Sequence, residues 1–405
     1  MVRRILIVSS QVRTVHSGVG TYAAMIIRGL NELAETVEVT IATWDREVDP
    51  ESYPELSWIG LGVHPRRDPT PGKFWTLGRR VVRAFDSKEF DFDVVHFLDV
   101  REGHAFVESG LAKDVEVIGT VHDDYAALVG RNPLHYIGSA ADPFRRFFFH
   151  RWLRRLEDRT YPKFDRLLVN SRATGETVRL AYGLDPARLT PVTLTIEPDA
   201  VPAQQSLVGE PSLVFVGGNF FRKGLNLCVE ALADLRVDFP GIRLHVIGSC
   251  SSSARIETLA RLLGVSDAIV FYGHLPAEQA AAMMAGADIF VMPSRTEALG
   301  LVYLEAFRAG VPVIAGDRGG VTQIVRHGTS GLLVTPGSSQ ELVDSIAKLT
   351  RDPELRQSLI NGGRKVLAER TPERLIAETT TVYGLSPLLA GSDADSKRLA
   401  PATSC

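Results

Sequence analysis

Cysteine is scarce in this sequence. Its 405 residues include three cysteines, Cys228, Cys250 and Cys405, and no two of them have CxxC spacing. Three cysteines cannot form a disulfide framework, so a reducing compartment is the simplest interpretation. No uncharged stretch reaches the ~18 residues of a membrane span. The apolar run near the N-terminus is short, is followed by Arg13 and lacks a small-residue cleavage site, which favours a first strand over a signal peptide. We therefore expect a cytoplasmic protein.

An excess of charge of one sign is missing as well. The chain has 45 basic and 48 acidic residues and a net charge of −3. Residues 1–200 contain 26 basic and 28 acidic residues, and the remainder contains 19 and 20. This balance argues against a nucleic-acid-binding protein. A hydrophobic content of 45% with 23% charged residues is ordinary for a globular protein, and the length suggests two or three domains.

Short apolar runs alternate with helical patterns along the whole chain. Most runs are continuously apolar, which is typical of strands covered on both faces of a parallel sheet. Repeated strand–helix alternation predicts a doubly wound α/β fold. The expected strands are Arg4–Ser9, Val37–Thr43, Val94–Phe97, Val117–Val121, Leu167–Asn170, Leu213–Val216, Leu244–Ile247, Ile269–Tyr272, Ile289–Met292, Val311–Ala315 and Gly331–Val334.

The strand–helix pattern starts again near residue 212, after a polar, proline-containing segment at 197–207 that is typical of a linker. We predict two Rossmann-like domains, an N-terminal one at 1–200 and a C-terminal one at 211–370. The cleft between them would lie beyond the carboxyl ends of the strands, where such sheets bind ligands. Residues 371–388 would form a C-terminal helix that could pack back on the N-terminal domain. A disordered tail is expected at 389–405.

The stretch from residue 293 to residue 315 carries the most informative motif. A helix is expected to begin near Gly300, with Glu297 just before it and Glu305 in its second turn. The free N–H groups of residues 298–301 and the helix dipole favour a phosphate, and the two carboxylates can accept hydrogen bonds from sugar hydroxyls. This combination favours a nucleotide sugar, and a capped helix with solvated acids is the competing interpretation.

A second motif follows the expected strand Leu213–Val216. Gly217 and Gly218 permit close approach of a ligand to the backbone. Arg222 and Lys223 could clamp a diphosphate at the end of this strand, although a solvated basic turn is the alternative.

Two weaker signals occur in the first half. Gly18 and Gly20 could approach a phosphate, but the third glycine of a dinucleotide fingerprint is missing, so NAD binding is not expected. His122 follows the strand Val117–Val121 and could bind a sugar or a leaving oxygen, although a structural histidine is the alternative.

Together these motifs resemble those of the family 4 retaining glycosyltransferases, which have the GT-B fold. Residues 288–336 carry the donor signature, with the Glu297–Glu305 spacing, the run EALGLVYLEAFRAGVPVIA and the later GTSGLLV. The SGVG, VHDD, VNS, FVGG…RKG and VIGS motifs follow in the order found in this family. The similarity extends over most of residues 3–385.

The resemblance implies a role for each candidate residue. Glu297 would contact the donor sugar and Glu305 the nucleotide ribose. Arg222 and Lys223 would neutralise the diphosphate, and His122 would lie near the transferred sugar. The remaining implied contacts are the backbone at Gly18, Gly20, Gly217, Leu299, Gly300 and Leu301 for phosphate, and Phe271–Gly273, including Tyr272, for the base.

The resemblance also implies the reaction. It would proceed with retention and without a metal or other cofactor, using a nucleotide-diphosphate sugar as co-substrate. The N-terminal domain would bind the acceptor, which is a hydroxyl of a sugar, a lipid-linked glycan or a small molecule, and the C-terminal domain would bind the donor. We expect first-domain loops such as 48–73 and 125–143 to select the base, the sugar and the acceptor, none of which the sequence identifies. One departure is Gly217-Gly218, where the family commonly has Gly-Arg, and Arg222 could compensate for it.

Two other classes of protein remain open from the sequence. One is a nucleotide-sugar epimerase or hydrolase of the same architecture, and the other is a catalytically inactive nucleotide-sugar-binding partner subunit. A glycan phosphorylase is less favoured because we identify no lysine site for pyridoxal phosphate.

The segment 144–163 combines seven basic residues and six aromatic residues with only two acids. As a helix it would carry Phe148, Phe149, Trp152, Leu153 and Leu156 on one side and Arg146, Arg151 and Arg154 on the other. It could contact an anionic membrane peripherally, at the inner membrane face, and present a lipid-linked acceptor. The alternative, which we favour, is a helix packed on the first domain with solvated arginines.

Overall fold

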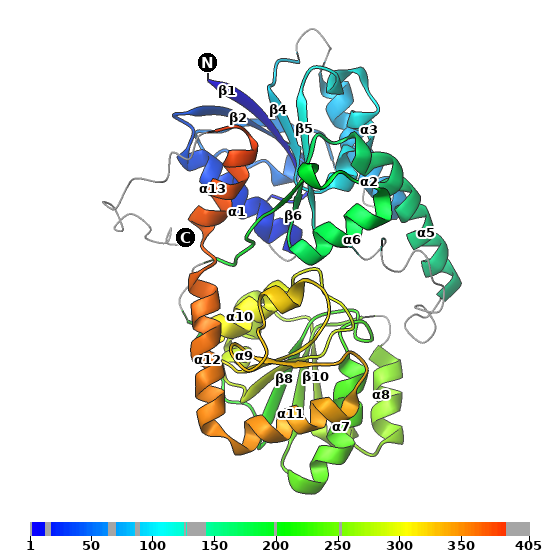
Figure 1. The fold of residues 1–405 in the computed structure, drawn as a ribbon, viewed down its shortest axis with the longest axis vertical. Coiled ribbons are helices and arrows are strands. Elements are labelled where there is room, and N and C mark those ends of the chain that lie inside the picture. Colours follow the sequence, from blue (N-terminus) through cyan, green and yellow to red (C-terminus); the bar gives the residue numbers. More distant parts are fainter. Residues whose placement is uncertain are drawn as a thin grey trace.

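The computed structural model describes residues 2–12, 18–63, 70–85, 90–124, 127, 143–197, 201–250 and 253–385. Two parallel sheets, each flanked by helices, form two Rossmann-like domains stacked end to end (Figure 1). The predicted α/β fold of two doubly wound domains is confirmed.

The N-terminal sheet contains seven parallel strands in the order β3-β2-β1-β4-β5-β6-β7. All four residues of the central strand β4 are buried, which explains its continuously apolar pattern. The order reverses between β1 and β4, so helices cover both faces. The strands are β1 Arg3–Val8, β2 Val37–Thr43, β3 Ser57–Gly60, β4 Val94–Phe97, β5 Glu116–Val121, β6 Arg166–Val169 and β7 Leu189–Pro191.

Five α-helices accompany this sheet in the part of the chain that the structure describes. They are α1 Gly18–Glu32, α2 Thr70–Ala84, α3 His104–Val107, α5 Pro143–Thr160 and α6 Arg172–Tyr182. Helix α6 begins after Ser171, whose side chain accepts a hydrogen bond from the Thr174 N–H, and ends at Gly183 with a φ of 64°. These are typical helix-capping positions for Ser and Gly.

The C-terminal sheet has six parallel strands in the order β10-β9-β8-β11-β12-β13, and its order reverses between β8 and β11. The strands are β8 Ser212–Val216, β9 Arg243–Ile247, β10 Ile269–Gly273, β11 Ile289–Met292, β12 Val313–Gly316 and β13 Leu332–Val334. The helices of this domain are α7 Leu225–Asp238, α8 Ser253–Leu262, α9 Ala277–Ala285, α10 Leu301–Ala309, α11 Ser339–Arg351 and α12 Pro353–Ala368. The helix after them, α13 Pro372–Val382, lies on the N-terminal domain.

Two strands lie where the sequence pattern gave no strand. Strand β3 falls inside the expected loop 48–73, and β7 is a three-residue strand. Each lies at an edge of the sheet and contains no fully buried residue, so neither produces a run of apolar residues. The expected loop 125–143 and the tail 389–405 fall almost entirely outside the described residues.

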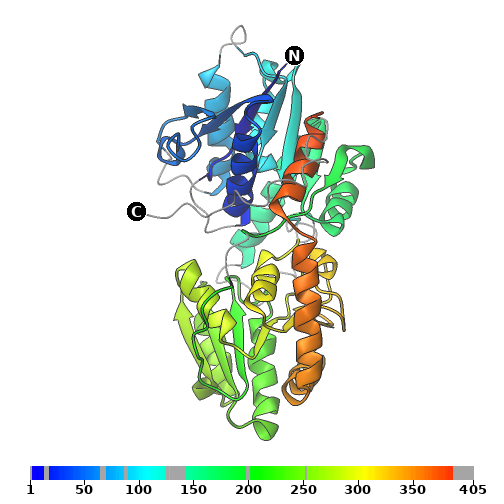
Figure 2. The same ribbon diagram turned by 90° about the vertical axis from the view of Figure 1, so that its left-hand side faces the viewer.

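The chain crosses between the domains a second time near its end. Helix α12 runs along the C-terminal domain, and α13 then packs against α1 of the N-terminal domain (Figure 2). A Cβ atom at Gly29 of α1 would lie 2.3 Å from the Ile376 side chain, so this glycine permits the close packing. No described helix is both long and apolar enough to cross a membrane.

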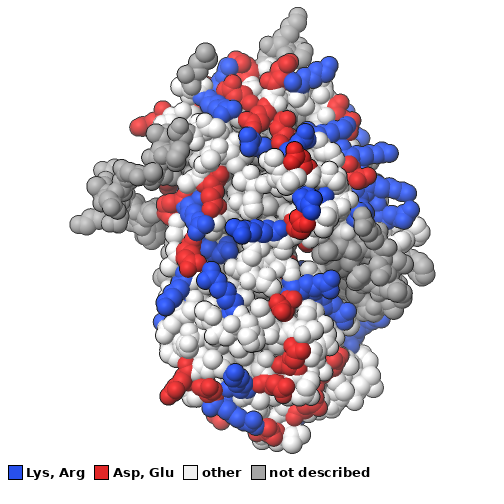
Figure 3. Space-filling model, in the orientation of Figure 1, with Lys and Arg blue, Asp and Glu red and all other residues white. Residues whose placement is uncertain are grey.

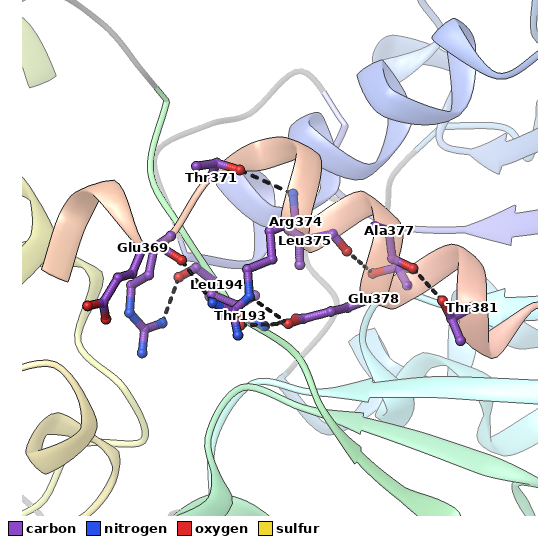
Figure 4. Close-up of polar contacts among 11 residues, drawn as sticks. Thr193, Leu194, Glu369, Thr371, Arg374, Leu375, Ala377, Glu378 and Thr381 are labelled. Carbon is purple, nitrogen blue, oxygen red and sulfur yellow. Dashed lines mark hydrogen bonds and ion pairs between the residues drawn. The ribbon is translucent and has the colours of Figure 1, made fainter. Parts of the chain in front are cut away.

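Polar contacts fasten the two crossings to each other (Figure 4). The Glu378 carboxylate accepts hydrogen bonds from the Thr193 N–H and from its hydroxyl, the latter at 2.9 Å. Arg374 donates to the same carboxylate at 2.9 Å, and Arg370 donates to the Leu194 carbonyl at 3.0 Å. Hydrogen bonds therefore hold the two connecting segments together.

Candidate active site

A cleft of about 750 Å³ lies between the two domains at the carboxyl ends of both sheets. In the C-terminal sheet it adjoins β8 and β11, between which the strand order reverses, as expected for a ligand site. The N-terminal domain contributes Gly18, Val19, Arg101, His122, Asp123, Asp124, Phe149, His150, Leu153 and Asn170, and Leu194 comes from the connection. The C-terminal domain contributes Val216, Gly217, Arg222, Lys223, residues 296–302 and Glu305.

The turn at residues 217–223 brings two cations back over the end of β8. Gly217 has a φ of 142°, and a Cβ atom there would lie 2.7 Å from Cδ of Lys223. Asn219 also has a positive φ, of 50°. The backbone thus folds tightly enough for the Lys223 side chain to lie against the glycine, where a larger residue would displace it.

Glu297 forms ion pairs with both of these cations. Its Oε1 atom lies 3.2 Å from Nη1 of Arg222 and 3.4 Å from Nζ of Lys223. Burial alone would raise the pKa of Glu297, but the charges of Lys223 and Arg222 outweigh it and hold this pKa below its usual value. The carboxylate is therefore ionised at neutral pH, and the three side chains form a compact ionic cluster in the cleft wall.

The 296–301 loop that follows β11 presents unpaired backbone amides. Gly300 caps helix α10 with a φ of 86°, and a Cβ atom there would lie 2.6 Å from the Tyr303 ring. Tyr303 is buried and donates a hydrogen bond of 2.8 Å to the Met292 carbonyl, which anchors the first turn of α10. Within the described part of the chain, no group accepts a hydrogen bond from the N–H of Leu299 or Gly300.

Glu305 lies one helical turn inside α10 and lines the same cleft. Burial raises the pKa of Glu305 more than the charges of Arg308 and Lys223 lower it. No described residue forms a hydrogen bond or ion pair with its carboxylate. Glu305 is half-buried, and its carboxylate can accept hydrogen bonds from a ligand in the cleft.

The N-terminal wall of the cleft holds His122 in a fixed orientation. Its Nε2 donates a hydrogen bond of 2.6 Å to the Leu98 carbonyl, and its ring packs edge-on against Tyr22 at 5.1 Å. Burial lowers the pKa of His122, so the ring is neutral at pH 7 and its Nδ1 lone pair is an acceptor.

A chain of buried polar groups connects this wall to α13. Thr120 Oγ1 lies 3.1 Å from the Tyr22 hydroxyl and 2.8 Å from Nε2 of His96, and Nδ1 of His96 lies 2.7 Å from the Tyr383 hydroxyl. Burial lowers the pKa of His96 to about 3, which keeps its ring neutral. Tyr22, which packs against His122, is thus linked by hydrogen bonds to Tyr383 at the end of α13.

Ten of the candidate site residues named from the sequence line the cleft. They are Gly18, His122, Gly217, Arg222, Lys223, Glu297, Leu299, Gly300, Leu301 and Glu305. Gly20 is buried inside α1, and Tyr272 lies on β10 with its hydroxyl 2.9 Å from Nδ1 of His245. Neither of these two residues is part of the cleft lining.

Sequence reasoning missed the polar residues Arg101, Asp123, Asp124 and Asn170. Arg101 binds Asp123 through both terminal nitrogens, at 2.8 and 3.0 Å, and binds Glu157 through Nε at 2.7 Å. Burial raises the pKa of Asp124 to about 6. These residues follow strands β4, β5 and β6, and this position at the carboxyl ends of parallel strands is the signal that could have identified them.

Asn170 points one side of its amide group at the His122 backbone. Its Nδ2 donates a hydrogen bond of 2.7 Å to the His122 carbonyl, and its buried Oδ1 has no hydrogen-bond partner among the described residues. The amide therefore supports the strand end that carries His122 and retains an acceptor next to it.

Helix α5 forms the outer part of the N-terminal wall. Phe149, His150 and Leu153 line the cleft, whereas Phe148 is 64% exposed. Arg154 donates to the Ala127 and Ala181 carbonyls at 2.7 and 3.1 Å, so it is not the solvated arginine that the helical wheel predicted. Arg151, Arg155 and Arg159 are exposed, and basic side chains gather along this edge of the domain (Figure 3).

Metal-ligating residues do not gather in this cleft or elsewhere in the described ranges: no group of three or more His, Cys, Asp or Glu side chains there could hold a metal ion.

Comparison with known proteins places the chain among glycosyltransferases. A sequence model of Glycosyltransferase Family 4 matches residues 16–199, and a model of Glycosyl transferases group 1 matches residues 199–366. Glycogen synthase of Mycobacterium tuberculosis is 25% identical over 389 residues, which cover 89% of this chain and 91% of that protein.

Two further similarities are to a mannosyltransferase and to a solved structure. The GDP-mannose-dependent alpha-(1-6)-phosphatidylinositol monomannoside mannosyltransferase of Mycobacterium tuberculosis is 34% identical over 192 residues, or 45% of this chain and 48% of that protein. The crystal structure of Anabaena HepE in complex with UDP and glucose has a TM-score of 0.69 at 17% identity, covering 95% of this chain and all of that one.

The two stacked Rossmann-like domains and the cleft between them define a glycosyltransferase with the GT-B fold. The chain belongs to the family 4 glycosyltransferases, as its motifs predicted.

Proposed function

We propose that this glycosyltransferase transfers a sugar from a nucleotide-diphosphate sugar to a hydroxyl acceptor, with retention of configuration and without a metal ion. Glycans, glycolipids and glycosylated metabolites are the product classes that such a reaction supplies. The observation that carries the proposal is that the cations Arg222 and Lys223, the acids Glu297 and Glu305 and the unpaired amides of the 296–301 loop line one cleft.

The two cations suit the charge that develops on a leaving diphosphate. Arg222 and Lys223 are oriented by Glu297 and partly shielded from water, with side chains 24% and 16% exposed, so little reorganisation is needed when negative charge appears on the phosphates. The unpaired N–H groups of Leu299 and Gly300, at the start of α10, would bind donor oxygens from the other side. The positive charge that a metal ion would supply can thus come from the chain itself.

The two acids suit the hydroxyl groups of the donor. Glu297 is ionised and, while still paired with the two cations, could accept hydrogen bonds from hydroxyls of the transferred sugar. Glu305 has a carboxylate without a described partner, and a ribose hydroxyl pair would satisfy it. His122, fixed as the Nε2–H tautomer, would accept a hydrogen bond at Nδ1 from the sugar on the acceptor side.

Retention would follow from attack on the same face that the diphosphate leaves. The acceptor hydroxyl would approach from the N-terminal wall, form the new glycosidic bond and pass its proton to the departing phosphate oxygen. The identification of this route rests on the family resemblance, and the anomeric configuration of the first-formed product, measured by NMR, tests it.

The first experiment is a thermal-shift panel with UDP, GDP, ADP, dTDP and their common sugar conjugates, with and without EDTA. A ligand at ~100 times its Kd should add about 2.7 kcal/mol of stability. UDP-glucose and GDP-mannose are the first conjugates to test, since one related structure contains UDP and glucose and one relative depends on GDP-mannose. We expect one nucleotide series to stand out, EDTA to have no effect, and Lys223→Ala to abolish the shift.

Several outcomes would contradict the proposal. No shift with any nucleotide would reject nucleotide-sugar binding, and loss of the shift with EDTA would reject metal independence. Release of free or isomerised sugar without an acceptor would indicate a hydrolase or epimerase. Binding without turnover across a broad acceptor panel would indicate an inactive partner subunit.

Helix α5 offers a second, separable proposal about the acceptor. Its exposed side carries Phe148 with Arg151, Arg155 and Arg159, spaced so that they share one face, while Phe149 and Leu153 line the cleft. This arrangement suits a peripheral contact with an anionic membrane that holds a lipid-linked acceptor. Salt-sensitive co-sedimentation with anionic liposomes, reduced in Arg151→Ala/Arg155→Ala, would support it, and no co-sedimentation would remove it.

A further inference from the structure

Two side chains of the N-terminal domain reach a backbone carbonyl of the C-terminal domain. The Ser171 hydroxyl, at the start of α6, donates a hydrogen bond of 2.7 Å to the carbonyl of Ala298 in the 296–301 loop. The Thr174 hydroxyl, one turn later in α6, donates to the same carbonyl at 3.3 Å. Both side chains are buried, so the contact is shielded from water.

The opposite side of the loop is held by a glycine turn. The Gly320 N–H donates a hydrogen bond of 2.7 Å to the Glu297 carbonyl. A Cβ atom at Gly320 would lie 1.7 Å from the Ala298 carbonyl oxygen and 2.6 Å from Oγ of Ser171, so only glycine fits. Three chain segments therefore meet at Ala298, and its carbonyl cannot reorient unless α6 withdraws.

The direction of this carbonyl sets the direction of the next amide. In a planar trans peptide, the N–H of Leu299 points opposite to the C=O of Ala298. With that carbonyl bound to α6, the Leu299 N–H points away from α6, and it has no partner among the described residues. Glu297, with its two cations, is the residue directly before Ala298.

We propose that Ser171 and Thr174 are positioning residues that orient the Ala298–Leu299 peptide for the donor. This assignment rests on the proposed function, because it takes the loop amides as donor contacts. Donor binding would then need both domains: the C-terminal domain carries the contacting groups, and α6 of the N-terminal domain fixes the peptide that carries one of them. Opening of the cleft would release the peptide and weaken the grip on the donor.

The test uses uncharged variants, which do not repel a phosphate. Ser171→Gly removes the hydroxyl while glycine still tolerates the helix-cap position at a cost of only a few tenths of a kcal/mol. Ser171→Thr, its matched control, retains the hydroxyl. Thr174→Val retains the side-chain volume and leaves the Thr174 N–H bonded to Ser171. Each variant is measured in the full chain.

Two readouts separate positioning from a merely structural role. Hydrogen–deuterium exchange of the ligand-free protein should be faster at residues 298–302 in Ser171→Gly and Thr174→Val, with exchange in the rest of α6 and the melting temperature little changed. The Kd for UDP-glucose or GDP-mannose, whichever binds the wild-type protein, should rise about tenfold, the scale of one lost buried hydrogen bond. Ser171→Thr should match the wild type in both.

Unchanged exchange at residues 298–302 in both Ser171→Gly and Thr174→Val would overturn the proposal. Faster exchange with unchanged donor affinity would also overturn it, because the contact would then be structural only. Failure of the wild-type protein to bind any nucleotide sugar would reject the proposed function instead, and the exchange data would still show whether α6 holds the loop.

Discussion

The two walls of the cleft are built in different ways. The C-terminal wall comes from two compact segments, 217–223 and 296–305, each placed directly between a strand and a helix. The N-terminal wall collects single residues from α1, the ends of β4, β5 and β6, helix α5 and the connection at Leu194. A diphosphate and a ribose need a fixed set of groups at fixed spacing, whereas an acceptor can be bound by side chains contributed one at a time.

The two walls also differ in their electrostatics. In the C-terminal wall, Glu297 is paired with two cations and its pKa lies below the usual range. In the N-terminal wall, burial raises the pKa of Asp124, and Arg101 is already bound to Asp123 and Glu157. Two cations thus share one acid in the C-terminal wall, whereas one cation faces two acids in the N-terminal wall, so a phosphate is favoured on the C-terminal side, which we assign to the donor.

The strongest test of this difference between the walls removes the carboxylate at the centre of the C-terminal wall. We expect Glu297→Ala to abolish transfer, because the sugar loses its acceptor group and the two cations lose the carboxylate that orients them. Turnover and circular dichroism are measured together. A variant that unfolds would instead show that this carboxylate is structural.

Removing one cation is expected to have the next largest effect. Lys223→Ala or Arg222→Ala should lower turnover on the order of 10²-fold or more, as for the loss of a group that stabilises developing charge. Arg236→Ala is a suitable control in the same domain, since Arg236 pairs with the exposed Asp267 away from the cleft. Near-normal turnover in both site variants would contradict the proposal that the C-terminal wall binds the diphosphate.

The N-terminal wall should respond to pH through Asp124. Burial raises the pKa of Asp124 from 3.8 to about 6, so the folded protein binds this proton more tightly than the unfolded chain does. The resulting stability is present below about pH 4 and is lost as the pH rises through about 6. A shift of this size corresponds to roughly 3 kcal/mol, or several degrees in melting temperature.

Asp124→Asn isolates that contribution. The melting temperature of the wild type, relative to the variant, should fall by several degrees between pH 4.5 and pH 7.5. Parallel pH profiles for the two proteins would show that Asp124 is not desolvated in solution. Binding of a nucleotide sugar by the variant at pH 7.5 should be close to normal if the N-terminal wall serves the acceptor.

The smallest expected effect tests whether the N-terminal wall binds the acceptor and not the donor. Phe149→Ala should raise the KM for the acceptor up to about tenfold, the scale of one aromatic contact, and leave the KM for the donor unchanged. Phe148→Ala on the exposed face of the same helix is the matched control in an assay without lipid. Equal effects on the two KM values would mean that the walls do not divide the substrates between them.

Sequence reasoning succeeded where function depends on local spacing. The two-domain α/β fold followed from continuously apolar runs, because strands buried on both faces leave that pattern. The residues Arg222, Lys223, Glu297, Gly300 and Glu305 were found because they lie in two short segments that follow strands, with the two acids on either side of a helix start. The cleft does bring them together.

The rest depends on contacts that local spacing does not encode. Arg101 and Asn170 also follow strand ends, but they meet in the cleft because β4, β5 and β6 are neighbours in the sheet, an order that residue spacing alone does not give. Strands β3 and β7 lie at sheet edges and carry no buried stripe. The solvated role expected for Arg154 was wrong because its guanidinium meets two backbone carbonyls that are distant in sequence.

The return of α13 to the first domain has a consequence for how the chain is made. Gly29 of α1 is covered by Ile376, and His96 is bound by Tyr383, so the first domain incorporates residues from the far end of the sequence. A single cut between the domains would leave α1 uncovered and His96 without its tyrosine. During synthesis, the second domain can fold as soon as it emerges, whereas the first can be completed only after α13 has left the ribosome.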